Sequence, residues 1–152
     1  MLPVETLKIG SEEATVVATT AETGGDLFAL ELRMPPGGGP PVMHRHWPSE
    51  VYRVLSGELT FYSGLGDDVV RRVARAGETV VLAGGTPHTI RNESAEDAVA
   101  FGVHAPGGPM EGFSRAAADL AASGSPAIED ILAVAEEHGI EMLAPVPTVV
   151  SF

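Results

Sequence analysis

Short segments rich in strand-forming residues recur at even spacing through the first two thirds of the chain. They comprise residues 14–20, 26–33, 50–55, 58–62, 69–74, 78–82, 88–92 and 97–104. Turn-forming residues separate them, and the chain carries 18 glycines and 12 prolines in 152 residues. Short strands at this spacing are typical of a β-sandwich or a closed barrel. The sequence therefore predicts an all-β fold for this part of the chain.

The pattern changes after the Pro-Gly-Gly-Pro break at residues 106–109. Residues 110–122 are rich in alanine, and residues 126–138 carry apolar side chains at helical spacing. These side chains are Ile128, Ile131, Leu132 and Ala135. We expect two C-terminal helices that pack on the barrel, all within one domain over residues 1–152. The expected boundaries are residues 12–106 for the barrel and 109–140 for the helical extension.

Composition narrows the classes of partner and of site. The formal net charge is −12 and the sequence pI is about 4.6, which disfavours nucleic acids and anionic membranes as partners. The chain has no cysteine, so any metal must bind to nitrogen and oxygen ligands. The N-terminus lacks the basic and apolar regions of a secretory signal, and we expect a soluble cytoplasmic protein with a small-molecule substrate.

Three histidines and one glutamate have the spacing of a metal site. His44 and His46 are two residues apart, so both imidazoles point to the same side of an extended strand. Glu50 follows after a Trp-Pro-Ser bend, and His88 follows a distant glycine-containing turn. Three neutral nitrogens and one carboxylate suit a divalent transition metal with open positions for water or substrate. Taken singly, each of these residues is more often an ordinary polar side chain than a ligand.

The chain resembles the cupin superfamily through two sequence motifs. The first, G-x5-HxH-x3,4-E-x6-G, is filled by Gly38, His44, His46, Glu50 and Gly57. The second, G-x5-PxG-x2-H-x3-N, is filled by Gly77, Gly85, His88 and Asn92, with Ala83 in place of the usual proline. The resemblance implies a single-domain (cupin 2 type) barrel, a double-stranded β-helix or jelly roll, with the two C-terminal α-helices added. It also implies that His44, His46, Glu50 and His88 bind the metal.

The segment from Gly37 to Tyr62 and the helical tail are most similar to small, single-barrel, quercetin-dioxygenase-like cupins. This resemblance implies a metal-dependent dioxygenase of a flavonol-like or other enolisable aromatic compound. In such enzymes the metal-bound glutamate also takes a proton from the substrate, a role that would fall to Glu50. Fe, Mn or Ni would suit this chemistry better than Zn. Two alternatives stay open: a non-oxidative isomerase or cyclase that uses the metal as a Lewis acid, and a non-catalytic binding barrel.

Candidate pocket residues and the oligomeric state follow less directly from the sequence. Alternation with Glu50 places Tyr52 on the site side, while Phe61 and Phe101 depend on the assumed strand register. Trp47 lies in the bend between ligands, where it either guards a pocket or packs. His104 and His138 match no motif, and we expect structural roles for both. Exposed sheet edges and family resemblance favour a homodimer.

Overall fold

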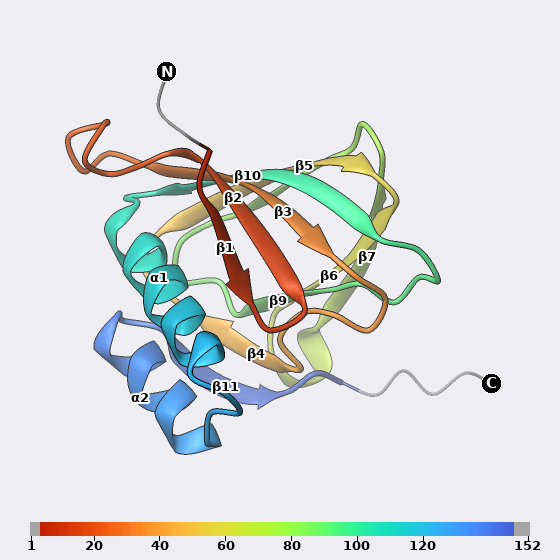
Figure 1. Cartoon of the computed structure of the whole chain (residues 1–152). Coiled ribbons are helices and arrows are strands. Elements are labelled where there is room, and N and C mark those ends of the chain that lie inside the picture. The colour runs from red at the N-terminus through yellow and green to blue at the C-terminus, as the bar shows by residue number, and fades with distance from the viewer. Residues whose placement is uncertain (1–3, 148–152) are drawn as a thin grey trace.

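The structure is a computed structural model that describes residues 4–147. It consists of two antiparallel β-sheets followed by two C-terminal helices (Figure 1). Sheet A has the strand order β1-β2-β3-β10-β5-β8. Its strands are β1 Thr6–Ile9, β2 Glu12–Ala18, β3 Phe28–Met34, β10 Ala98–Ala105, β5 Ser49–Ser56 and β8 Thr79–Leu82. Sheet B has the order β11-β4-β9-β6-β7. Its strands are β11 Glu141–Pro145, β4 Val42–Arg45, β9 His88–Arg91, β6 Glu58–Ser63 and β7 Val70–Arg75.

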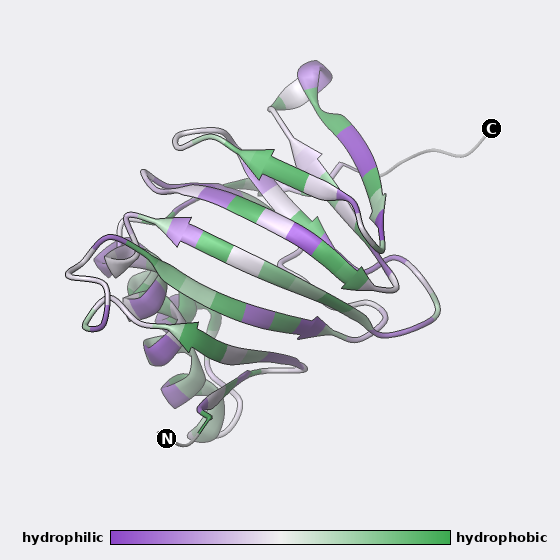
Figure 2. Cartoon of the chain, turned by 90° about the horizontal axis from the view of Figure 1, so that it is seen from above, coloured by the Kyte–Doolittle hydropathy of each residue, from purple (hydrophilic) through white to green (hydrophobic). Residues whose placement is uncertain are grey.

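The two sheets enclose one apolar core. Sheet A contributes side chains such as Val54 and Leu82, and sheet B contributes Leu59, Phe61 and Ile90. Buried residues alternate with exposed residues along β5 and with partly buried residues along β10, as expected when only one face of a strand meets the core. Figure 2 shows the same alternation of apolar and polar residues along the strands. The predicted β-rich fold is confirmed.

Three strands extend the sheets beyond the expected pattern. β1 precedes the expected start of the barrel and pairs with β2 at the edge of sheet A. β4 carries His44, in line with the extended strand expected for His44 and His46, although it was not among the strand segments inferred from composition. β11 follows the helices and returns to pair with β4, with Met142 opposite His44. The chain after the helices therefore supports the strand that leads into the histidine pair.

The two C-terminal helices were expected, and both are present. α1 spans Gly108–Ala122 and α2 spans Ile128–Glu137, ending before Gly139, whose φ of 75° suits glycine. Among the four apolar residues expected on one face of α2, Ala135 is fully buried but Ile128 is 69% exposed. Within the described residues, no helix combines the length and apolarity needed to cross a membrane.

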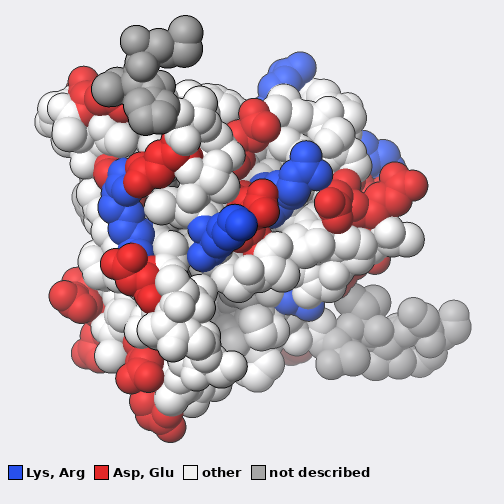
Figure 3. All heavy atoms as spheres, viewed as in Figure 1, with Lys and Arg blue, Asp and Glu red and all other residues white. Residues whose placement is uncertain are grey.

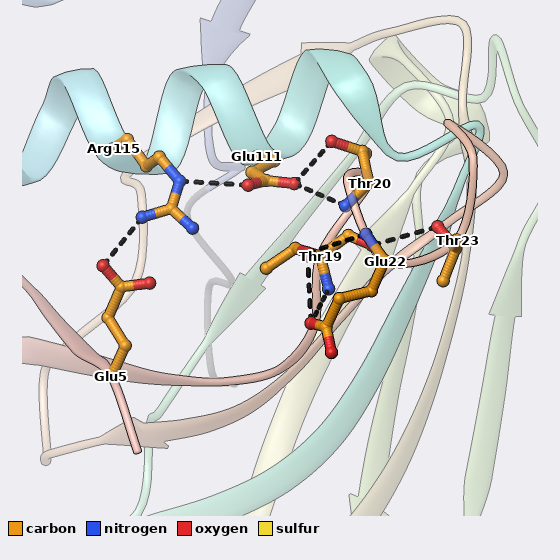
Figure 4. Close-up of polar contacts among 7 residues, drawn as sticks. All are labelled: Glu5, Thr19, Thr20, Glu22, Thr23, Glu111 and Arg115. Atoms are coloured by element: carbon orange, nitrogen blue, oxygen red, sulfur yellow. Dashed lines mark hydrogen bonds and ion pairs between the residues drawn. The ribbon is translucent and has the colours of Figure 1, made fainter. Parts of the chain in front are cut away.

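Helix α1 is tied to the N-terminal part of sheet A by a polar cluster (Figure 4). Glu111 Oε1 accepts hydrogen bonds of 2.8 Å from both the backbone N–H and the hydroxyl of Thr20. Its other oxygen accepts from Arg115 Nε at 3.0 Å, and Arg115 also binds Glu5 at 2.8 Å. Burial alone would raise the pKa of Glu111, but the bonds from Thr20 and Arg115 together lower it. The ionised carboxylate thus holds the helix in place.

Surface charge is mixed on the face seen in Figure 3, where Lys and Arg side chains lie among Asp and Glu side chains. Ion pairs at the surface include Arg45 with Glu141 at 2.9 Å and Arg71 with Glu93 at 2.9 Å. Exposed pairs of this kind contribute little to stability, typically about 0 to 1 kcal/mol. The fold therefore depends mainly on the core between the sheets.

We expect Glu111→Gln to lower the free energy of unfolding by about 1 to 3 kcal/mol at pH 7, because charge-assisted bonds from Thr20 and Arg115 are weakened. The folded-state pKa of Glu111 lies below its ordinary value of 4.5, so this stabilisation is present above that pH. It is lost as the pH falls through the folded-state pKa. Urea unfolding of both proteins at pH 7 and at acid pH measures the difference, with Glu129→Gln on α2 as the control. A difference that persists unchanged in acid would contradict the assignment.

Candidate metal centre

Sheet B brings three histidines together at one end of the barrel interior. His44 lies on β4, His46 follows directly after it, and His88 begins β9, where it is paired with His44 across the two strands. One ring nitrogen from each histidine lies within 4.8 Å of those of the other two. His46 and His88 are buried, and His44 is partly buried. The structure therefore brings together the three histidines that the spacing predicted.

Backbone carbonyls fix which nitrogen of each ring can bind a metal. The Nδ1 atoms of His44, His46 and His88 lie 3.4, 3.0 and 2.8 Å from the carbonyl oxygens of Val42, Pro48 and Thr86. A carbonyl oxygen only accepts, so each Nδ1 carries the proton and donates it. The lone pair of each neutral ring is then on Nε2. This is the arrangement by which metal-binding histidines are oriented in proteins.

Glu50 approaches the histidines from sheet A. Its Oε2 atom lies 3.2 Å from His46 Nε2 and 2.5 Å from His88 Nε2. These three buried atoms have no hydrogen-bond partner with proper geometry. Buried polar atoms without partners are costly unless something satisfies them. A cation between the four side chains would satisfy all of them, so the residues fit a divalent metal.

The charge states of His44 and Glu50 agree with this fit. Burial, reinforced by the neighbouring His88, lowers the pKa of His44 to about 4, so its imidazole is neutral at pH 7. Burial would raise the pKa of Glu50, but the close approach of the His104, His46 and His88 rings holds it well below its ordinary value. A neutral imidazole and an ionised carboxylate are the forms that bind a metal.

The bend between His46 and Glu50 is held by the turn that precedes His88. Gly85 N–H donates to the His46 carbonyl at 2.8 Å, and Gly84 N–H donates to the Ser49 hydroxyl at 2.9 Å. A Cβ atom on Gly84 would lie 2.0 Å from the Trp47 carbonyl oxygen, so only glycine fits there. The two sequence motifs are thus in direct contact, although Gly84 itself is outside the motif positions.

His104 is a site residue that the sequence reasoning missed. It lies opposite Glu50 in the register of β10 and β5, with its Nδ1 atom 3.0 Å from Glu50 Oε1. Its Nε2 atom lies 3.1 Å from the Tyr52 hydroxyl, which also donates to Glu50 Oε1 at 3.0 Å. His104 thus contacts the glutamate rather than serving only as a strand end. Gly102, two residues earlier on β10, is buried, so the alternation of side chains along a strand places His104 on the same inward face.

The four candidate pocket aromatics have different positions. Tyr52 is buried beside Glu50, and Phe61 is buried in the core with its ring centroid 5.9 Å from that of Tyr52. Phe101 lies on the outer face of sheet A, because it alternates with the inward residues Gly102 and Ala100. The expected placement of Phe101 beside the ligands is therefore corrected. Trp47 is 80% exposed, so it does not pack in the core.

Comparison with known proteins agrees with this architecture. A family model described as "Cupin domain" matches residues 30–104. This part of the chain is similar to cupin domains, and the chain has the cupin fold. No curated protein sequence matches the chain.

His138, the one remaining histidine, lies outside the cluster on the C-terminal side of α2.

Solved structures share the fold at low sequence identity. An uncharacterized conserved protein with a double-stranded β-helix domain from Klebsiella pneumoniae is 25% identical, with a TM-score of 0.54 over 66% of this chain and 81% of that one. A predicted oxalate decarboxylase from Thermotoga maritima is 18% identical, with a TM-score of 0.57 over 67% and 90%. A sugar phosphate isomerase from Silicibacter pomeroyi is 17% identical, with a TM-score of 0.53 over 64% and 60%. The last two similarities concern the fold alone.

We expect His44→Ala and His88→Ala each to reduce metal affinity by at least about tenfold while the barrel stays folded, because each removes one donor and little apolar burial. His138→Gln is the matched control, since it removes an imidazole outside the cluster. Metal content per chain after dialysis, measured by elemental analysis alongside circular dichroism, checks this. Full occupancy in both alanine variants would disprove the ligand assignment.

Removal of the metal should lower thermal stability, because the folded cluster binds the ion and the unfolded chain does not. At a free metal concentration 100 times the Kd, the linkage amounts to about 2.7 kcal/mol. For a chain of this size that corresponds to a fall in Tm of about 5 to 10 °C. Calorimetry before and after verified chelation measures it, and an unchanged Tm would show that folding and metal binding are not coupled.

Proposed function

We propose that this chain is a metal-dependent enzyme, a dioxygenase that acts on a flavonol-like or other enolisable aromatic small molecule. The observation that carries the proposal is the position of Glu50. One of its oxygens faces the three imidazoles, and the other is held by Tyr52 and His104. A carboxylate oriented from behind in this way is suited to take a proton from a substrate bound at the metal.

His44, His46, His88 and Glu50 would hold the metal through nitrogen and oxygen donors. A divalent metal bound there would act as a Lewis acid on a substrate oxygen. Glu50 Oε2 is the oxygen on the imidazole side and would accept the hydroxyl proton of the substrate. The Tyr52 hydroxyl keeps Oε1 engaged, so the carboxylate cannot rotate freely. Burial of this group excludes bulk water from the proton transfer.

Two features favour dioxygenation over other reactions. The donor set without sulfur suits Fe, Mn or Ni, ions that serve in oxygen chemistry. In oxidative cleavage of a flavonol-like ring both atoms of O₂ enter the products and the substrate supplies all of the electrons, so this reaction balances without an external reductant. Buried Tyr52 and Phe61 near the site favour a flat, apolar substrate. The similarity of the sequence to quercetin-dioxygenase-like cupins supports the same reaction.

A non-oxidative isomerase or cyclase is the second candidate, because proton transfer by Glu50 does not itself require O₂. Proteins of this fold include the isomerase and the predicted decarboxylase named above, so the fold hosts more than one reaction class. Oxygen consumption with a flavonol or a diketone would support the dioxygenase. Turnover under anaerobic conditions would support the isomerase, and ligand-induced stabilisation without turnover would support a binding protein.

Glu50→Gln separates proton transfer from metal binding, because the amide keeps a neutral oxygen donor and cannot act as the base. We expect metal affinity to fall about 10- to 100-fold and turnover per bound metal to fall about 100- to 10,000-fold. Metal content and oxygen uptake are measured on the same preparation. Glu13→Gln on β2 makes the same change of charge at an exposed position and serves as the control.

The outcomes distinguish the roles of Glu50. If metal loading is lost together with turnover even at saturating metal, the charge of Glu50 serves to hold the ion and the base lies elsewhere. If loading and turnover both persist, Glu50 is neither ligand nor base, and the proposed mechanism is wrong.

A further inference from the structure

Helix α2 turns most of its apolar stripe toward solvent. Ile128 is 69% exposed, Leu132 44% and Ile131 37%. These three residues are spaced three and four positions apart, so their side chains are neighbours on one face of the helix. α2 packs mainly against α1 and β11 and lies on the outer side of α1 (Figure 1). The packing therefore leaves the larger side chains of the stripe uncovered.

The stability of α2 itself does not explain this exposure. A helix of ten residues is too short to be stable alone and depends on the packing of its apolar face. Ala135 is the buried residue of α2, although burial of an Ile or Leu side chain stabilises a fold far more than burial of Ala. Exposed apolar side chains that lie next to one another mark an interaction site. We therefore looked for what this face of α2 could bind.

A groove continues the stripe from α2 onto β11. It has a volume of about 440 Å³ and is lined by Leu132, Glu136, Gly139, Ile140, Glu141 and Met142. Ile140 is buried, so it forms part of an apolar floor that is large enough for a bulky side chain of a partner. Leu132 belongs to both the stripe and the groove. We call this continuous surface, formed by Ile128, Ile131, Leu132, Ile140 and Met142, the α2 surface.

Both ends of α2 carry acidic residues beside the α2 surface. Glu129 and Asp130 lie in the first turn, and Glu136 and Glu137 follow Ala135 at the end of the helix, where the last turn has no basic residue. Carboxylates near a helix C-terminus are unfavourable for the helix dipole, so Glu136 and Glu137 do not stabilise α2. Within residues 4–147 none of these four acids forms an ion pair.

The acidic character extends over the whole C-terminal part of the chain. Residues 116–152 contain six Asp and Glu residues and no Lys or Arg, so they carry half of the formal net charge of −12. In Figure 3 the lower left, where Figure 1 places α2, shows acidic and uncharged side chains without basic ones. The earlier part of the chain carries all nine basic residues. A cation that approaches the protein is therefore attracted most strongly to this part of it.

We propose that the α2 surface binds a basic amphipathic helix of a partner protein. Apolar side chains of the partner, spaced three and four residues apart, lie on the stripe, and one of them enters the groove beside Leu132. Lys or Arg side chains on its flanks pair with the acids at the two ends of α2. This binding requires neither the metal nor a substrate, so it is independent of the proposed enzymatic function.

The charges disfavour a second copy of this chain as the occupant. If two α2 helices packed antiparallel, Glu129 and Asp130 of each would face Glu136 and Glu137 of the other. If they packed parallel, each acid would face its own copy. Both arrangements bring like charges together, which is unfavourable.

The length and charge of the surface disfavour two other kinds of occupant. A small molecule that fills the groove would leave Ile128 and Ile131 exposed, because the groove does not include them. Nucleic acids and anionic lipids carry the same sign of charge as the rim. An amphipathic segment with positive charge satisfies the whole surface.

Peptide binding tests the apolar part of the surface. The probe is a fluorescein-labelled helical peptide of about four turns, built from lysine and from leucine at helical spacing. We expect Ile128→Gln and Leu132→Gln each to raise the Kd roughly 5- to 20-fold in fluorescence anisotropy, because each removes apolar burial. Val81→Gln is the matched control, since Val81 is 68% exposed on β8, and its Kd should stay within about twofold of wild type. Circular dichroism checks that each variant is folded.

A second pair of variants tests the charges. We expect Glu129→Gln/Glu136→Gln to raise the Kd roughly 5- to 10-fold at low salt, and less at high salt, because two attractions to lysine are lost. Glu13→Gln/Glu31→Gln makes the same change of net charge at exposed positions of sheet A and should have a much smaller effect. A peptide with glutamate in place of lysine should not bind. Backbone NMR signals of residues 128–142 should shift most when the lysine peptide is added.

Four results would each overturn the proposal. The first is that the lysine peptide does not bind. The second is that either control variant weakens binding as much as its test variant, which would show attraction to an acidic protein in general. The third is self-association of the wild-type chain that Ile128→Gln abolishes, which would make a second copy the occupant. The fourth is that a small aromatic amine such as phenethylamine shifts the NMR signals of residues 139–142 while the peptide does not, which would indicate a small-molecule site.

Discussion

The buried carboxylate of Glu50 is the group around which the rest of the site is arranged. It lies in the barrel interior with a side chain that is 3% exposed, where an ionised group without partners would be very costly. Sheet B supplies His46 and His88 on one side of it, and sheet A supplies Tyr52 and His104 on the other. The two sheets therefore meet at a polar cluster as well as at the apolar core, and a bound cation would complete that cluster.

The loops at this end of the barrel are held by close backbone contacts, which keep the histidines in position before any ion binds. Gly39 approaches β9 so closely that a Cβ atom would lie 2.1 Å from the Ile90 carbonyl oxygen. Glu12 accepts a hydrogen bond from Gly39 N–H at 2.9 Å, and Arg91 donates to the Gly39 carbonyl. A site held by its surroundings in this way loses less entropy on metal binding than a flexible one would.

Because successive side chains of a strand point to opposite faces, sheet A presents different residues on its inner and outer faces. Glu50, Tyr52 and His104 point inward to the candidate metal centre, while Val51, Arg53 and Val103 on the same strands point outward.

The sequence by itself determined the local features, the strand and helix segments, and it indicated the candidate ligands His44, His46, Glu50 and His88. Residue spacing along one strand fixes which side chains share a face, which covers His44 and His46, whereas His88 was indicated by the resemblance to the second sequence motif. Other features depended on pairing between distant strands, which spacing cannot give. The β10–β5 register placed His104 beside Glu50 and turned Phe101 outward, and the return of β11 to β4 followed from tertiary packing. A shift of one residue in register would exchange the inward and outward sets, so only the tertiary structure could decide them.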